Sequence, residues 1–253
     1  MPDRTTVTLP SATGYWVESR WPLVSLVFVC PLLLAYEIGV LALGPEAVRN
    51  GADVWLRQLL DAIGFGQYFL LPVLTVCLLL AWHYTTGLPW RVPRGVLSGM
   101  LGECLVLALC LRVILEVQGR LLAGITGRAG LLTLDLSGLC GRAVGFLGAG
   151  VYEELLFRLM LFSGAVWLLR RLGLKRPMAT AGSVVLTSLS FAGAHYIGPH
   201  GEPVAWSQGL FWFSFSFRFL AGVFFSLLFV YRGFGIAAGA HAGYDILVGI
   251  VQF

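Results

Sequence analysis

Long apolar runs constrain the fold of this chain more than any other feature. They cover residues 21–43, 67–84, 95–117, 143–169, 179–197, 209–231 and 233–253. A transmembrane α-helix needs about 20 consecutive and mostly apolar residues. Short breaks that contain glycine, proline and charged residues separate the runs, as expected for loops between helices. We therefore predict an all-α fold, a polytopic bundle of transmembrane helices.

The composition agrees with this class. Of the 253 residues, 58% are hydrophobic and 12% are charged, whereas a soluble domain carries about 25% charged residues. Transmembrane β-strands alternate apolar and polar residues over about ten positions, so the uniform runs exclude an outer-membrane barrel. We expect one membrane domain over residues 1–253, with N-terminal helices in residues 1–120 and the candidate functional residues within residues 140–250.

Two segments leave the number of spans open. Residues 50–64 are short and alternate apolar and polar residues at helical spacing, which predicts a helix lying on the membrane surface. Residues 119–142 are rich in Gly and Arg, and their apolar piece at 131–136 predicts a loop that dips into the interface. The prediction is seven spans, or eight if one of these segments crosses. The first apolar run is too long for a signal-peptide core, so we expect it to be retained as the first span.

Charge and cysteine usage narrow the partners. The 17 Lys and Arg residues outnumber the 13 acidic residues and give a net charge of +4. They cluster in the loops, where they set topology, and form no basic stripe interleaved with aromatic residues. We therefore predict no nucleic-acid partner. The five cysteines show no CxxC spacing, which argues against a disulfide framework or a thiolate metal site. Membrane lipid is the partner that the apolar runs imply.

Ionisable residues within the apolar runs are the candidates for function. Glu153 and Glu154 are adjacent in the fourth run, and Arg158 follows one helical turn later. A charge at the bilayer centre costs about 3 kcal/mol on insertion scales, so each needs a partner or a wet cavity. Glu154 and Arg158 share one helix face, whereas Glu153 points about 100° away. The Glu154–Arg158 pair fits a structural ion pair, but Glu153 has no partner on its own helix.

Two later runs carry further polar side chains. His195 follows Phe191 by four residues in the fifth run, and His241 precedes Asp245 by four residues in the seventh. Each could form an ordinary helix–helix or local hydrogen bond. Gly and Ala residues at 235–243 permit close helix approach, so the polar side chains are expected to meet those of the fourth run.

Several hydrolytic mechanisms lack their sequence patterns. The His-Glu-x-x-His pattern of zinc peptidases is absent. His195, His241 and Glu153 could in principle form a His₂Glu set, so a metal-dependent intramembrane protease remains an alternative. No Gly-x-Ser-x-Gly motif and no local signature of a cysteine nucleophile with its base is present. We predict neither a metal nor a cofactor.

Three motifs in this order resemble the CPBP family of intramembrane glutamic endopeptidases, which includes CAAX prenyl proteases and bacteriocin-processing, Abi-like proteins. They are Glu153-Glu154-x-x-x-Arg158, Phe191-x-x-x-His195 and His241-x-x-x-Asp245. The resemblance covers residues 140–250 and implies a catalytic core there. It also implies a bacterial inner (cell) membrane location and a protein or peptide substrate cleaved close to the membrane, without a metal.

The resemblance further implies a role for each residue. Glu153 matches the general base that activates water together with the histidine matching His195. Glu154 and Arg158 match residues that hold the helix and shape the site.

His241 and Asp245 match a His-x-x-x-Asn pair that stabilises the oxyanion. An ionised aspartate cannot donate a hydrogen bond, so we expect Asp245 to orient His241, which then donates. Two other classes remain open: a non-catalytic immunity or scaffold protein, and a transporter with a proton-relay carboxylate. The lack of an internal repeat argues against the transporter.

Overall fold

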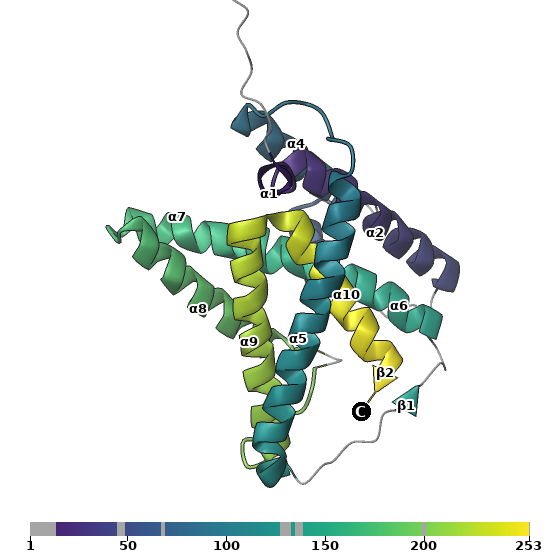
Figure 1. Cartoon of the computed structure of the whole chain (residues 1–253), viewed down its shortest axis with the longest axis vertical. Coiled ribbons are helices and arrows are strands. Elements are labelled where there is room, and N and C mark those ends of the chain that lie inside the picture. Colours follow the sequence, from purple (N-terminus) through teal and green to yellow (C-terminus); the bar gives the residue numbers. More distant parts are fainter. Residues whose placement is uncertain are drawn as a thin grey trace, which may run out of the picture.

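Helices occupy every apolar run that the sequence predicts to cross the membrane (Figure 1). The computed structural model describes residues 14–44, 49–66, 69–126, 133–134, 139–198 and 201–252. In chain order the α-helices are α1 (Tyr15–Glu18), α2 (Pro22–Leu43), α3 (Gly51–Ala62), α4 (Leu70–Thr86), α5 (Val96–Thr126), α6 (Leu139–Gly148), α7 (Ser163–Arg171), α8 (Arg176–Ala194), α9 (Gly209–Arg232) and α10 (Phe234–Ile250). Two π-helical segments, η2 (Ala149–Glu153) and η3 (Leu155–Phe162), lie between α6 and α7.

Two short strands are the only non-helical elements of the described chain. Strand β1 (Thr133–Leu134) pairs antiparallel with β2 (Val251–Gln252). The pairing brings the predicted interfacial loop to the end of α10. The rest of the apolar piece at 131–136 lies outside the described residues.

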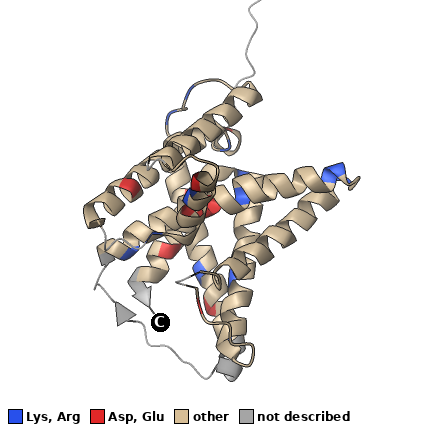
Figure 2. Ribbon diagram, turned by 180° about the vertical axis from the view of Figure 1, so that it is seen from behind, with Lys and Arg blue, Asp and Glu red and all other residues tan. Residues whose placement is uncertain are grey.

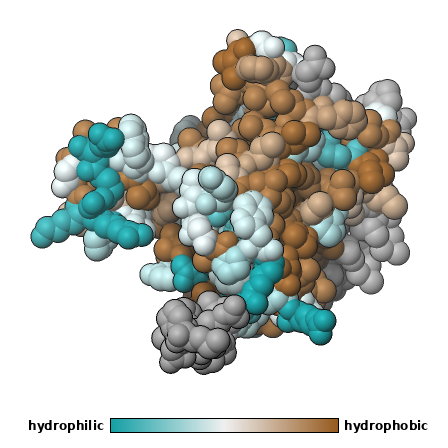
Figure 3. Space-filling view, turned by 90° about the horizontal axis from the view of Figure 1, so that it is seen from above, coloured by the Kyte–Doolittle hydropathy of each residue, from teal (hydrophilic) through white to brown (hydrophobic). Residues whose placement is uncertain are grey.

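Three helices, α2, α8 and α9, are long and apolar enough to cross a membrane, and α4 is a shorter apolar helix. Large apolar side chains on these helices face outward, such as Ile38, which is 62% exposed. Figure 3 shows hydrophobic residues over much of the surface and hydrophilic ones gathered at the projecting tip, where α7 turns into α8. Such a surface suits lipid rather than water, and an integral membrane protein is indicated. The total of seven or eight spans stays a prediction.

Helix α5 is longer than its apolar run and takes up part of the predicted loop at 119–142. The run ends at residue 117, but the helix continues to Thr126. Of its two ion pairs at i,i+4 spacing, Arg112–Glu116 at 3.5 Å lies within the run and Arg120–Glu116 at 3.0 Å spans the end of the run. Such pairs stabilise polar helix surfaces, which explains how α5 extends past its apolar residues.

The predicted surface helix at 50–64 forms as α3, but its inner face is covered by protein. Ala52, Asp53 and Leu56 are buried, and α3 packs against α4 and η2. Its outer face remains apolar and accessible, since Leu59 and Ile63 are 53% and 61% exposed. Helix α3 therefore connects the surface of the bundle with the segment that contains the glutamates.

Helix α10 lies in the centre of the bundle, where it contacts α2, α5, α6, α9 and η2 (Figure 1). Small residues allow these contacts. A Cβ atom on Gly235 would lie 2.9 Å from the Cα atom of Ser25 in α2, and one on Gly150 of η2 would lie 2.8 Å from the carbonyl oxygen of Ala238. The close approach that the Gly and Ala residues predict therefore occurs, and it places α10 directly beside the glutamates.

The glutamates belong to a π-helical stretch and not to the plain α-helix expected over 143–169. Segment η2 ends at Glu153, and η3 begins at Leu155. π-Helical turns are rare and often occur at functional sites. Periodicity cannot reveal this local change, because the run is apolar at almost every position around the glutamates.

Candidate active site

The two adjacent glutamates have different surroundings, as their angular separation predicts. Glu154 is completely buried and faces the protein interior. Glu153 is 9% exposed and lines a cavity of about 680 Å³. Figure 2 shows acidic and basic residues close together in the middle of the bundle, with other charged residues scattered around it. One carboxylate is therefore part of the core and the other is accessible from the cavity.

Glu154 connects two positively polarised groups. Its Oε1 atom lies 3.0 Å from Nη1 of Arg158 and 2.7 Å from Nδ1 of His241. The Arg158 contact is the i,i+4 ion pair that the sequence predicts. Glu154 lies between η2 and η3, so its contact with His241 joins this junction to α10, 87 positions later in the sequence.

Arg158 is 1% exposed and is surrounded by aromatic rings. Its guanidinium carbon lies 4.5 Å from the ring centroid of Phe191 and 5.4 Å from that of Phe225. Its Nη2 donates to the carbonyl oxygen of Gly222 at 3.3 Å. A buried cation is costly unless it is paired, and here Glu154, a carbonyl and two aromatic faces compensate for the lost water.

Glu153 receives one hydrogen bond and leaves its second oxygen unpaired. Nδ2 of Asn50, at the start of α3, donates to Oε1 of Glu153 at 2.8 Å. Among the described residues, Oε2 has no hydrogen-bond partner, and Nε2 of His241 lies 3.8 Å from it. Glu153 therefore keeps an unused hydrogen-bond acceptor on a side chain that lines the cavity.

His195 is the C-cap residue of α8 and also lines the cavity. Its Nδ1 lies 2.8 Å from the carbonyl oxygen of Phe191. A carbonyl oxygen can only accept, so Nδ1 carries the hydrogen and Nε2 of the neutral ring is the acceptor. The Phe191-x-x-x-His195 spacing thus fixes the tautomer through the backbone, and it also places the two rings edge to face at 5.0 Å.

His241 is held from two sides. The ring of Phe225 stacks on it with centroids 4.3 Å apart and planes 15° apart, and Glu154 binds its Nδ1. Asp245 lies 3.6 Å from Nε2, which is longer than a hydrogen bond. The side chain that orients His241 in the structure is therefore Glu154, a role that the sequence analysis gave to Asp245. Helical spacing placed Asp245 correctly, but it could not reveal a partner from another helix.

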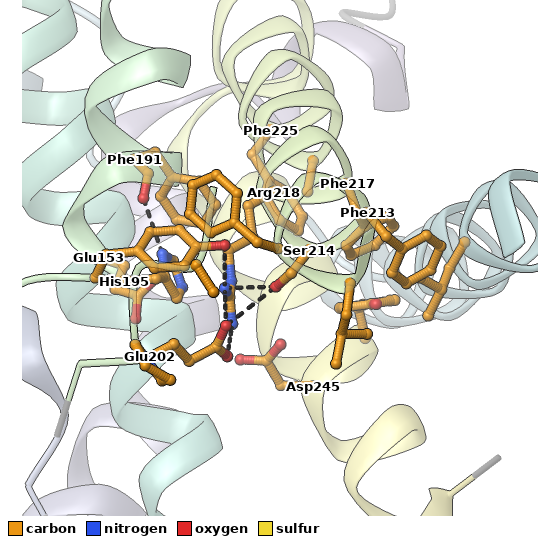
Figure 4. Close-up of a pocket in the computed structure, with 18 of the residues that line it drawn as sticks. Glu153, Phe191, His195, Glu202, Phe213, Ser214, Phe217, Arg218, Phe225 and Asp245 are labelled. Carbon is orange, nitrogen blue, oxygen red and sulfur yellow. Dashed lines mark hydrogen bonds and ion pairs between the residues drawn. The ribbon is translucent and has the colours of Figure 1, made fainter. Parts of the chain in front are cut away.

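Side chains from three separate helical segments meet at the cavity. Glu153, His195, His241 and Asp245 line it, whereas Glu154 and Arg158 lie behind them in the core. Figure 4 shows Glu153, His195 and Asp245 around the same space, with the aromatic residues of α9 along one side. The arrangement combines an accessible carboxylate and two imidazoles in a cavity with mainly apolar walls, a setting that favours proton transfer.

An ion pair closes another side of the cavity. Arg218 of α9 pairs with Glu202 through both guanidinium Nη atoms, one of them at 2.8 Å, and its Nη1 also donates to Ser214 at 2.7 Å. The Arg218 guanidinium holds the pKa of Glu202 below its ordinary value. The backbone N–H of Glu202 donates to the carbonyl oxygen of His195 at 2.9 Å. The loop at 201–208 is therefore attached to both α8 and α9.

Sequence reasoning missed some of these contacts. The sequence analysis did not single out Arg218, whose carboxylate partner is Glu202. Asn50 was not considered at all, although an Asn just before a helix is a common N-cap. Its contact with a residue 103 positions away has no signal in a single sequence.

Among the described residues, no group of three or more His, Cys, Asp or Glu side chains has the geometry to hold a metal ion. The His₂Glu set considered above is made up of His195, His241 and Glu153. His241 uses Nδ1 for Glu154, which leaves only Nε2 for any ligand.

Comparison with known protein families gives one match. Residues 137–247 match the family described as Rce1-like, type II CAAX prenyl endopeptidase. No curated protein and no solved structure matches the chain significantly. The matched region contains η2, η3, α8, α9 and most of α10, and therefore all seven residues named in the three motifs. The CPBP resemblance inferred from those motifs is thus confirmed over residues 137–247, a region that is similar to the Rce1-like family of type II CAAX prenyl endopeptidases.

Proposed function

We propose that the protein is an intramembrane endopeptidase that hydrolyses a peptide bond of a membrane-associated protein or peptide. In this proposal Glu153 and His195 activate water, and no metal takes part. The observation that carries the proposal is the unpaired Oε2 atom of Glu153, a residue that lines the same cavity as His195 and His241. A buried carboxylate with no structural task for one of its oxygens has the surroundings of a general base.

The first step uses the free acceptors of the cavity. A water molecule donates one hydrogen to Oε2 of Glu153 and the other to Nε2 of His195. Glu153 then takes a proton, and the water oxygen attacks the carbonyl carbon of the substrate. The carbonyl π electrons move to oxygen and form the tetrahedral oxyanion.

His241 stabilises the negative charge that forms on the oxyanion. The cluster contains three carboxylates, Glu153, Glu154 and Asp245, and the guanidinium of Arg158 balances one of them. An imidazolium at His241 supplies a second positive charge. With Nδ1 bound to Glu154, its Nε2–H is the donor that faces the cavity and stabilises the oxyanion.

Collapse of the tetrahedral intermediate completes the reaction. The C–N bond breaks as Glu153 returns its proton to the amine nitrogen. One product is the new amine and the other is a carboxylic acid, which loses its proton to solvent. The base is then ready for the next turnover, and no cofactor is consumed.

The surroundings agree with a substrate that reaches the site from the membrane. Membrane lipid covers the apolar outer surface, and the aromatic side chains of α9 line the cavity. Within this proposal the protein is a multi-pass protein of the bacterial inner membrane. The name of the matched family refers to prenylated proteins with a CAAX end, and such a substrate is one member of the class proposed here.

The test is a search for a precursor. Cells producing the wild type or Glu153→Gln are compared by mass spectrometry of protein termini. We expect one or a few membrane-associated proteins to stay uncleaved with Glu153→Gln and with His195→Ala. If both variants process every terminus as the wild type does, the protein is a non-catalytic scaffold or immunity protein.

Metal independence is tested on the purified protein in detergent, with a substrate found in that search. We expect zinc chelators to leave the rate unchanged. Loss of activity on chelation, with recovery on added Zn²⁺, would establish the metal-dependent alternative.

A further inference from the structure

Asn50 contacts the proposed base from outside the matched domain. Its Oδ1 accepts from the backbone N–H of Ala52 at 2.9 Å, which makes Asn50 the side-chain N-cap of α3. Its Nδ2 donates to Oε1 of Glu153 at 2.8 Å. Because the oxygen of the amide is bound to an N–H group, the nitrogen must be the atom that faces Glu153. The orientation of the amide is therefore determined by its two partners.

We propose that Asn50 is a positioning residue for Glu153, and this inference rests on the proposed function. One oxygen of the carboxylate is held by Asn50, and the other remains free to bind the water molecule. Without the amide donor, the carboxylate can rotate and present either oxygen to the cavity. A base that must stay within hydrogen-bond reach of one water molecule depends on such a constraint.

Helix α3 is anchored firmly enough to serve this purpose. Asp53, one turn into the helix, is 0% exposed and accepts from the hydroxyl of Tyr36 at 2.8 Å and from Arg49 at 2.7 Å. Arg57 binds Asp53 at 2.6 Å and also binds Glu37 of α2 at 3.0 Å. Two guanidinium groups thus face two carboxylates, and the charges of this cluster balance.

The same cluster reaches the residue next to Glu153. The hydroxyl of Tyr152 donates to Oε1 of Glu37 at 2.6 Å, and the rings of Tyr36 and Tyr152 pack edge to face at 5.5 Å. The backbone of η2 and the first turn of α3 are therefore fastened to the same side of α2. This places Asn50 and Glu153 in a fixed relation, although 103 positions separate them in sequence.

The test separates the cap of α3 from the donor to Glu153. Asn, Asp and Ser are about equally good N-caps, but only Asn supplies an amide donor. With a substrate identified as above, we expect Asn50→Ser to lower kcat by about 10-fold to 100-fold with KM nearly unchanged. Asn50→Asp, which places a second carboxylate beside Glu153, should lower kcat further. Both variants should unfold within a few degrees of the wild-type Tm.

A matched control removes a buried hydrogen bond elsewhere. Ser25 accepts from the backbone N–H of Gly235 at 3.1 Å and does not line the cavity. We expect Ser25→Ala to lower the Tm and to keep the wild-type kcat. If Asn50→Ser does not fold, Asn50→Asp alone carries the comparison, since its cap is retained.

The outcomes distinguish this inference from the proposed function. Wild-type kcat in both Asn50→Ser and Asn50→Asp, with an inactive Glu153→Gln, would overturn the positioning role only. Full activity of Glu153→Gln would overturn the proposed function itself. Asn50 would act only as a helix cap if the loss of kcat in each variant were in proportion to its loss of Tm. Loss of the amide donor would then have no effect of its own on kcat.

Discussion

Two buried ion-pair clusters in this bundle differ in how completely their carboxylates are bonded. In the first, Glu103 of α5 accepts from Arg232 at both oxygens, at 2.6 and 2.7 Å, and from the hydroxyl of Tyr15 at 2.5 Å. Arg232 also donates to Ser19 and to the carbonyl oxygen of Trp16. Every polar atom of this carboxylate has a partner.

The second cluster contains Glu153, Glu154 and Arg158. Each glutamate has one bonded oxygen, and among the described residues the other oxygen of each has no hydrogen-bond partner. Leaving buried polar atoms unbonded costs free energy. The first cluster fastens α1 to α5 and α9 and has a fully bonded carboxylate, whereas the second keeps one unbonded oxygen on each glutamate, and Glu153 lines a cavity. Incomplete bonding therefore separates the candidate site from a structural ion pair more clearly than burial or charge does.

The largest effect is expected from Glu153→Gln. The amide keeps the shape of the side chain but cannot take a proton, so the rate of cleavage should fall by about 1000-fold or more. The Tm should change little, because Oε2 has no hydrogen-bond partner among the described residues and lies 3.8 Å from Nε2 of His241. Cleavage is followed by mass spectrometry, and unfolding is followed in the same detergent.

Glu103→Gln makes the same substitution in the first cluster and serves as the matched variant for Glu153→Gln. It should lose stability and keep the wild-type kcat for each folded molecule. Equal losses of kcat in the two variants would mean that an unbonded carboxylate oxygen does not mark the catalytic cluster.

A second prediction concerns Glu154→Gln. The substitution leaves Arg158, which is 1% exposed, without its counter-charge. Breaking a buried pair in this way costs about 3–5 kcal/mol. His241 also loses a charged partner, so activity should fall as well. Thermal unfolding and cleavage are measured on the same preparation.

The corresponding change in the first cluster should cost less. Glu103 and Arg232 retain 15% and 10% side-chain exposure, so water partly solvates the remaining charge, and we expect a loss of about 1–3 kcal/mol for Glu103→Gln. A greater loss of stability in Glu103→Gln than in Glu154→Gln would contradict this ranking.

The parts of the structure that could be predicted from the sequence are those that depend on neighbouring residues in the chain. Apolar runs predicted the positions of the helices, because length and hydrophobicity are local properties. The i,i+4 rule predicted the Glu154–Arg158 pair, and the small residues at 235–243 predicted the close approach of α10. Family motifs indicated which polar residues would meet.

Contacts between distant segments could not be derived in this way. Asn50 and Glu202 each bind a functional segment from a neighbouring helix or loop, and neither belongs to a repeated or periodic pattern. The π-helical segments on either side of Glu154 could not be predicted either, because the run around them is apolar at almost every position. The tertiary partners of the polar residues, and with them the orientation of His241, thus required coordinates.

A third prediction tests the role of Asp245, which lies too far from His241 for a hydrogen bond. Asp245→Asn should keep activity within about tenfold, since Glu154 continues to orient the ring. Steady-state kinetics measure this directly. A folded but inactive Asn variant would show that the negative charge of Asp245 is required.

The smallest effect is expected at Glu202, whose bond with Arg218 holds the loop at 201–208. The pKa of Glu202 is lowered by its contact with Arg218. The ionised carboxylate therefore stabilises the attached loop at any pH above the ordinary glutamate pKa of about 4.3. That contribution is lost as the pH falls through the lowered value. Because Glu202 is 45% exposed, solvent screening keeps the contribution small. Glu202→Gln should therefore raise KM slightly and leave kcat unchanged at neutral pH.

Hydrogen exchange of the loop can resolve this effect. The protection of residues 201–208 in the wild type, divided by that in Glu202→Gln, cancels most of the intrinsic pH dependence of exchange. The ratio should exceed one from neutral pH down to about pH 5 and approach one in stronger acid. A ratio of one at neutral pH would mean that the ion pair does not hold the loop. In that case the Glu202–Arg218 pair would have no structural role, unlike the fully bonded cluster at Glu103.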